Sequence, residues 1–186
     1  MIQAQSALGI LMTEHRLIDR VVADVTLELG ELASGKREID PEYIDTVVDF
    51  IRTYADRLHH GKEENILFLE LVMKPLPEQV EDAMRMLVDD HIWARAKTSA
   101  LVAATVRYRA GDDGAAEDIA DTLTKLLHFY PIHIEKEEHS FFKMALEQFS
   151  AEERDAMLVR FRAFERLMPV QEKYLGVVQE LDARRA

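Results

Sequence analysis

Apolar residues recur every three or four positions along most of the chain, which is the spacing of one buried face of an α-helix. The pattern fills four long segments, at about 7–34, 41–73, 78–110 and 115–148, followed by a shorter tail. No stretch alternates apolar and polar residues as a half-buried strand does, and the sequence contains no internal repeat. The chain is therefore predicted to be all-α.

Helix-breaking and helix-capping residues mark the ends of these segments. The breaks between the four segments contain glycine or proline and run from Gly35 to Pro41, from Lys74 to Pro77 and from Gly111 to Gly114. Asp40 is placed to cap a helix that begins at Pro41. Ser150 and Glu153 fit a capping box at the start of the tail, and Pro169 divides the tail. One or two further helices are therefore expected after the fourth segment.

Four amphipathic helices joined by short connections pack most economically as an antiparallel up-down-up-down four-helix bundle. We expect this bundle over about residues 7–148 and a helical C-terminal extension over about 150–185. A chain of 186 residues is long enough to bury a sizeable core in one domain. The prediction is therefore a single domain that spans residues 1–186. The apolar stripe of the second segment extends as far as Met73, so Met73 is predicted to be buried.

Each of the four segments carries one histidine on its apolar stripe, and two segments add a glutamate four residues later. The histidines are His15, His59, His91 and His133, and the glutamates are Glu63 and Glu137. A separation of four residues turns an α-helix by only about 40° beyond a full turn, so each glutamate points the same way as its histidine. Four imidazoles and two carboxylates are thus predicted to converge in the core.

A buried carboxylate without a partner costs several kcal/mol or stays protonated. Ion pairs with Arg95 and Lys62 could neutralise the two glutamates, but they would leave four converging imidazoles unexplained. A metal centre accounts for both kinds of side chain. Imidazole and carboxylate without thiolate suit iron, manganese or zinc, and six protein ligands exceed the needs of one tetrahedral zinc. The favoured interpretation is two non-haem iron ions bridged by Glu63 and Glu137, with zinc or manganese as possible substitutes.

The polar residues of the stripes lie in four motifs: Glu14-His15, HHGKEENILF from residue 59, His91-x-x-x-Arg95 and HIEKEEHSFF from residue 133. Together these motifs resemble the hemerythrin-like (HHE cation-binding) domain family over about residues 7–148. The resemblance implies a four-helix bundle in which a non-haem di-iron centre is held by His15, His59, Glu63, His91, His133 and Glu137. The stripes select the same six residues independently. Ferritin-like di-iron proteins carry Glu-x-x-His instead, and the order His-x-x-x-Glu argues against that class.

Two departures from the oxygen-carrying hemerythrins concern Arg95 and Glu138. Those proteins use His-x-x-x-His in the third helix, where this chain has Arg95 at the second position. They also commonly place a carboxylate five residues after the histidine of the fourth helix, which here is Glu138, whereas Glu137 shares the stripe with His133. The loss of one histidine argues against reversible oxygen carriage and favours reaction with peroxide or sensing. Arg95 is expected either to neutralise an anion at the centre or to extend into solvent.

Other polar residues near the motifs have two interpretations each. His60 is predicted to face solvent, with a position behind the metal ligands as the alternative. Glu14 either accepts a hydrogen bond from a ligand histidine or lies on the surface. Tyr54 and Tyr130 are expected to pack in the core, with a hydrogen bond at the centre as the alternative. The histidines predicted to lie on the surface are His128 and His139.

Composition and charge exclude several classes of function. A net charge of −12 disfavours nucleic acid and anionic membranes as partners. The absence of cysteine excludes disulfides, thiolate metal sites and cysteine nucleophiles. No apolar run approaches the roughly 18 residues that span a bilayer, and the first residues do not resemble a secretion signal, so a cytoplasmic protein is expected.

Three functions fit these observations. The first is binding or sensing of O2, NO or peroxide, or handling of iron, in oxidative-stress physiology. The second is an enzyme that uses the same centre for peroxide breakdown or ferrous oxidation. The third is a metal-free helical interaction protein whose inner histidines are paired with Glu63, Glu137 and Arg95. The ligand set alone does not separate the first two functions, and it leaves the oligomeric state open.

Overall fold

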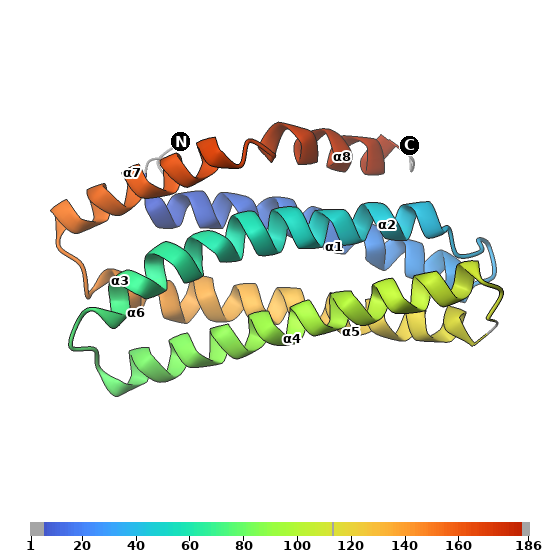
Figure 1. Cartoon of the computed structure of the whole chain (residues 1–186), viewed down its shortest axis with the longest axis horizontal. Coiled ribbons are helices and arrows are strands. Elements are labelled where there is room, and N and C mark those ends of the chain that lie inside the picture. The colour runs from blue at the N-terminus through green and yellow to red at the C-terminus, as the bar shows by residue number, and fades with distance from the viewer. Residues whose placement is uncertain (1–5, 113, 184–186) are drawn as a thin grey trace.

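The computed structural model describes residues 6–112 and 114–183, and all regular structure in these ranges is helical. Four helical rods lie side by side (Figure 1). The first rod is α1 (Ala7–Ala33), and the third is α4 (Glu78–Arg109). The second rod consists of α2 (Pro41–Phe50), η2 (Ile51–His60), η3 (Glu63–Phe68) and α3 (Leu69–Val72). The fourth consists of α5 (Ala115–Lys136), η4 (Glu137–Phe141) and α6 (Phe142–Leu146). The predicted all-α class is confirmed.

Each rod contacts two neighbouring rods, so that the four rods surround a common core. α1 packs against α5, α5 against α4, α4 against α2 and η2, and η2 against α1. Successive rods run in opposite directions along the long axis (Figure 1). Inward-facing side chains from all four rods therefore meet near the midline of the molecule.

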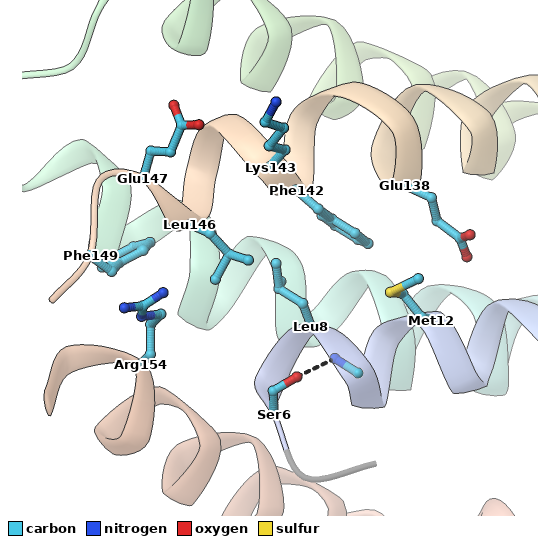
Figure 2. A pocket seen from close by; sticks show the side chains of 11 residues that line it. Ser6, Leu8, Met12, Glu138, Phe142, Lys143, Leu146, Glu147, Phe149 and Arg154 are labelled. Carbon is cyan, nitrogen blue, oxygen red and sulfur yellow. Dashed lines mark hydrogen bonds between the residues drawn. The ribbon is translucent and has the colours of Figure 1, made fainter. Parts of the chain in front are cut away.

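The predicted caps are present in the structure. The Asp40 carboxylate accepts N–H groups in the first turn of the helix that begins at Pro41. Ser150 and Glu153 form a complete capping box. Ser6 provides a cap that was not predicted, because its hydroxyl accepts an N–H of the first turn of α1 (Figure 2). Asp113, part of the third predicted break, lies outside the described residues.

Two of the rods contain wide turns, in which a backbone N–H bonds to the carbonyl five residues earlier rather than four. These turns are η2, η3 and η4. All three overlap the HHGKEENILF and HIEKEEHSFF motifs. A wide turn shifts the core-facing side of a helix relative to the regular spacing of about 3.6 residues per turn. Neighbouring residues can therefore both point inward at these motifs.

The tail forms α7 (Ala151–Leu167) and α8 (Gln171–Ala183), which lie along the outside of the rods (Figure 1). α7 packs on α1 and η3, and α8 packs on α1. Phe161 and Tyr174 anchor the two helices and are fully buried. The prediction of one or two tail helices is confirmed.

The prediction that Met73 is buried is wrong, because α3 ends at Val72 and leaves Met73 84% exposed.

Among the described residues, no helix combines the length and the apolar character needed to cross a bilayer.

Gly61 allows α7 to approach the second rod closely. A Cβ added at Gly61 would lie 3.0 Å from the tip of the Phe164 ring. We expect Gly61→Val to lower the free energy of unfolding by about 1–3 kcal/mol, because its branched side chain forces α7 outward. Gly30→Val is the control, since nothing lies within 4 Å of a Cβ there, and it should change stability by less than about 0.5 kcal/mol. If the two variants change the free energy of unfolding in urea equally, the contact between Gly61 and Phe164 does not hold α7 in place.

Candidate metal centre

Seven side chains with metal-ligating atoms meet at one buried point between the rods. They form two groups, one of His15, His59, Glu63 and Glu137, and one of His60, His91 and His133. The donor atoms of each group lie within 4.8 Å of one another. None of these residues is more than 2% exposed. The structure thus brings together the six residues selected from the stripes and adds His60.

The prediction that His60 faces solvent is wrong. Its imidazole stacks on that of His91 with ring centroids 3.8 Å apart. A regular α-helical spacing places His60 on the polar face that contains Asp56, but η2 is a wide turn that ends at His60. The wider turn directs His59 and His60 into the core together.

The two central glutamates lie between the two groups of imidazoles. Each carboxylate directs one oxygen toward an imidazole of the first group and the other oxygen toward an imidazole of the second group. The distances to Nε2 are 3.7 Å from Glu63 Oε1 to His59, 3.4 Å from Glu63 Oε2 to His91, 3.0 Å from Glu137 Oε2 to His15, and 3.1 Å from Glu137 Oε1 to His133. This arrangement suits carboxylates that share their oxygens between two cations.

Five other carboxylates lie behind the imidazoles and accept hydrogen bonds from Nδ1. The pairs are His15 with Glu138 at 2.8 Å, His59 with Glu14 at 3.1 Å, His60 with Asp56 at 3.4 Å, His91 with Glu64 at 2.7 Å and His133 with Asp90 at 3.3 Å. An Nδ1–H that donates to a carboxylate leaves Nε2 with a lone pair directed at the centre. Metal-ligating histidines are oriented by carboxylates in this way.

These outer contacts decide between the interpretations of Glu138 and Glu14. Glu138 lies behind His15 and is paired with Arg16, at the edge of a cavity of about 660 Å³ between α1 and α6 (Figure 2). Glu14 is buried and contacts His59 and Lys62, so the surface interpretation of Glu14 is wrong. Both glutamates orient histidines and do not face the centre themselves.

Arg95 and Lys62 do not neutralise the central glutamates. Lys62 pairs with Glu14 and, at 3.1 Å, with Glu165 of α7. Arg95 has a side chain 38% exposed and reaches Asp56 at 2.7 Å and Glu64 at 2.8 Å. The expectation that Arg95 neutralises an anion at the centre is not met by these contacts. Its guanidinium instead holds the carboxylates behind His60 and His91.

The centre contains buried polar atoms that no protein group satisfies. Among the described residues, no hydrogen bond reaches either carboxylate oxygen of Glu63 or Glu137, or Nε2 of His91 or His133. Such atoms destabilise a fold by about 1–3 kcal/mol each, and charged ones by more. Cations at this point would turn all of them into ligands, so the residues fit a metal centre.

The pKa shifts at the centre reflect the negative charge of its buried carboxylates. Burial lowers the pKa of His15, but the adjacent carboxylates of Glu137 and Glu138 outweigh it and raise the pKa to about 9. Burial lowers the pKa of His133 as well, but the charge of Glu137 helps to raise it to about 10. Burial, and then the charge of Glu137, raise the pKa of Glu63 well above its ordinary value. In the chain by itself, protons supply the charge that metal ions would supply.

Residues 6–145 match the family described as the hemerythrin HHE cation-binding domain, which is most of the chain. The chain belongs to this family. No curated protein and no solved structure matches it significantly. The resemblance predicted from the motifs is confirmed, and cation binding is the general property of hemerythrin HHE domains that the histidine and glutamate cluster fits.

In this hemerythrin domain a fifth imidazole comes from the second rod. The third rod has Arg95 where the oxygen carriers have a second histidine, but His60 adds an imidazole beside His91. Five imidazoles therefore lie at the centre despite Arg95, and the expectation that reversible oxygen carriage is disfavoured stays a prediction. One sequence signal could have found His60, because Asp56 precedes it by four residues and orients its Nδ1. The predicted surface positions of His128 and His139 are confirmed, since both are exposed.

Proposed function

We propose that this hemerythrin domain holds two non-haem iron ions inside an antiparallel up-down-up-down four-helix bundle, with α7 and α8 completing a single domain. Glu63 and Glu137 would bridge the two ions. The proposed terminal ligands are His15 and His59 for one ion and His60, His91 and His133 for the other. The observation that carries the proposal is the placement of one oxygen of each central glutamate toward either group of imidazoles.

The donor set favours iron over zinc. The seven donor residues exceed the four that one structural zinc takes, and the chain offers no thiolate. Shared between two ions, with both glutamates bridging, they would give four protein ligands to one ion and five to the other. Iron and manganese accept this mixture of nitrogen and oxygen ligands with higher coordination numbers. Iron would supply reversible redox chemistry and affinity for small ligands such as O2, NO or peroxide.

The side chains of the chain define where a small ligand would bind. The group that contains His15 and His59 has two imidazoles, whereas the other group has three. An ion held by the first group would therefore have the smaller number of protein ligands and could accept a small ligand as well. The ring of Phe142 stacks on His15 with centroids 5.9 Å apart, and the buried Leu11 and Phe141 belong to the same apolar cluster as Phe142. These apolar side chains exclude bulk water and favour small, weakly polar ligands.

The proposed role is binding or sensing of O2, NO or peroxide, or handling of iron, in oxidative stress. The metal-free interaction protein is disfavoured, because it would leave the oxygens of Glu63 and Glu137 without a hydrogen bond among the described residues, and because Arg95 and Lys62 pair elsewhere. Steady-state peroxide consumption by the iron-loaded protein would favour the enzymatic alternative. Reversible spectral change without turnover would favour binding or sensing.

Iron loading tests the proposal directly. Anaerobic incubation with ferrous iron, followed by desalting and metal analysis, is expected to give about two iron ions per chain. Admission of oxygen should then change the optical spectrum. The exposed-histidine variant His139→Ala is the control and should load equally, since it removes an imidazole outside the centre. Less than one bound iron ion per chain would contradict the proposal.

A further inference from the structure

A different cavity, of about 310 Å³, lies on the side of the centre that contains His60. Its walls come from η2, α4 and α5. His60, Asp56 and Arg95 all line the cavity, and Arg95 is hydrogen-bonded to Asp56. A ligand in this cavity would therefore lie next to the buried imidazole of His60 without replacing it.

The rim of the cavity carries positive charge that the protein does not neutralise. Arg52 and Arg57 are exposed and line the cavity, and neither forms an ion pair with any residue that the structure describes. Arg95 is already paired with Asp56 and Glu64, so Asp56 adds little free negative charge. Two unpaired guanidinium groups at one opening are unusual in a chain with a net charge of −12. They form a local site that attracts anions.

A buried hydroxyl without a partner lines the same cavity. Tyr130 is 4% exposed, and its hydroxyl makes no hydrogen bond within the described residues. Burial, and then the charge of Asp56, raise the pKa of Tyr130, so the hydroxyl stays protonated and acts as a donor. A buried donor without an acceptor costs free energy, which a ligand oxygen in the cavity would recover.

We propose that this cavity binds a small organic oxyanion, whose carboxylate or phosphate group is held by Arg52, Arg57 and the Tyr130 hydroxyl. The volume lies at the lower end of the range for ligand pockets, which limits the ligand to a small molecule. Ile51 and Ala94 provide apolar wall for its carbon skeleton. Guanidinium groups suit this chemistry because they bind carboxylates and phosphates with paired hydrogen bonds.

The cavity also offers a connection to the centre, and this consequence rests on the proposed function. Arg95 donates to Asp56, and Asp56 accepts from Nδ1 of His60. An anion that draws Arg95 away from Asp56 would strengthen the hydrogen bond from His60 and make its imidazole a stronger donor. Binding of the anion itself does not depend on iron.

Calorimetric titration of the full chain tests the site, in both iron-loaded and metal-free protein. The probes are succinate and inorganic phosphate, with the uncharged succinamide as a control. Saturable binding of at least one anion per chain, weakened by added salt and absent for succinamide, is expected. Binding of succinate alone assigns a carboxylate ligand, and binding of phosphate alone assigns a phosphate ester.

Variants locate the binding in this cavity. The double variant Arg52→Gln and Arg57→Gln should weaken binding about tenfold, and Tyr130→Phe about fivefold. Tyr130→Phe should not lower the melting temperature, because the hydroxyl it removes has no partner among the described residues. Arg166→Gln removes an exposed arginine of α7 that does not line this cavity and should bind as the parent does.

Failure of both anions to bind, or equal affinity of the parent and the double variant, would overturn the anion site. If iron loads normally in that case, the proposed function stands. If the anions bind but iron does not, the proposed function fails and the anion site stands.

Discussion

Replacing His60 with alanine is expected to reduce the iron content of anaerobically loaded protein from about two ions to about one per chain. His60 is one of three imidazoles in its group, and its ring is packed against His91. Removal of a ligand leaves that position with two imidazoles and opens a buried gap beside them. Metal affinity falls steeply when one ligand is removed, because the ion loses a bond and the remaining ligands do not complete its coordination. The other group, which contains His15 and His59, should keep its ion.

Two matched variants make this experiment decisive. His128→Ala removes an exposed histidine of α5 and should leave the iron content unchanged. Asp56→Asn keeps His60 but weakens the acceptor behind its Nδ1, so it should lower metal affinity about 10–100-fold without abolishing binding at high iron concentration. An unchanged iron content in His60→Ala would show that His60 packs beside the centre without binding metal.

The helices could be predicted because their signals are local. Caps such as Asp40 and Ser150, and breaks such as the one after Lys74, act within a few residues of where they occur. The stripe of each rod also depends only on a regular helical repeat. The structure therefore has its rods where the sequence placed them, within a few residues at each end.

The departures arise where the helical repeat itself changes. A stripe drawn with 3.6 residues per turn cannot place His60, because η2 has wider turns that the sequence pattern does not mark. The stripe left Arg95 with two interpretations, one at the centre and one extended into solvent, and its guanidinium turns outward to Asp56 and Glu64. The pairing of His133 with Asp90 joins residues 43 positions apart on neighbouring rods, so it depends on tertiary packing.

The same packing connects the tail to the centre. Lys62 is fully buried between Glu14, which orients His59, and Glu165 of α7. A buried lysine needs such partners because an unpaired ammonium is costly to desolvate. The position of α7 and the orientation of His59, a proposed metal ligand, therefore both depend on the ion pairs that Lys62 forms with Glu14 and Glu165. Sequence spacing gave no indication of this connection, since it joins three separate segments.

Substituting Glu63 with glutamine is expected to change stability in opposite directions in the two metal states. In metal-free protein the variant should raise the free energy of unfolding by about 1–3 kcal/mol. The pKa of Glu63 is raised in the folded chain, first by burial and then by the charge of Glu137. The stability that this carboxyl contributes at low pH is therefore lost as the pH rises from its ordinary pKa toward the raised one. Glutamine has nearly the same shape, does not ionise and can donate its amide N–H to Glu137.

In iron-loaded protein the same substitution should lower the melting temperature. It removes an anionic bridging ligand, so iron affinity should fall at least about 100-fold, and the stabilisation that bound metal adds by linkage falls with it. Glu64→Gln is the contrasting variant, because Glu64 already pairs with His91 and Arg95 and its loss should destabilise both metal states. Thermal melting of each variant, metal-free and iron-loaded, measures all four combinations. If Glu63→Gln instead destabilises the metal-free chain as Glu64→Gln does, Glu63 is satisfied by protein partners, and the metal-free interaction protein becomes the better account of the core.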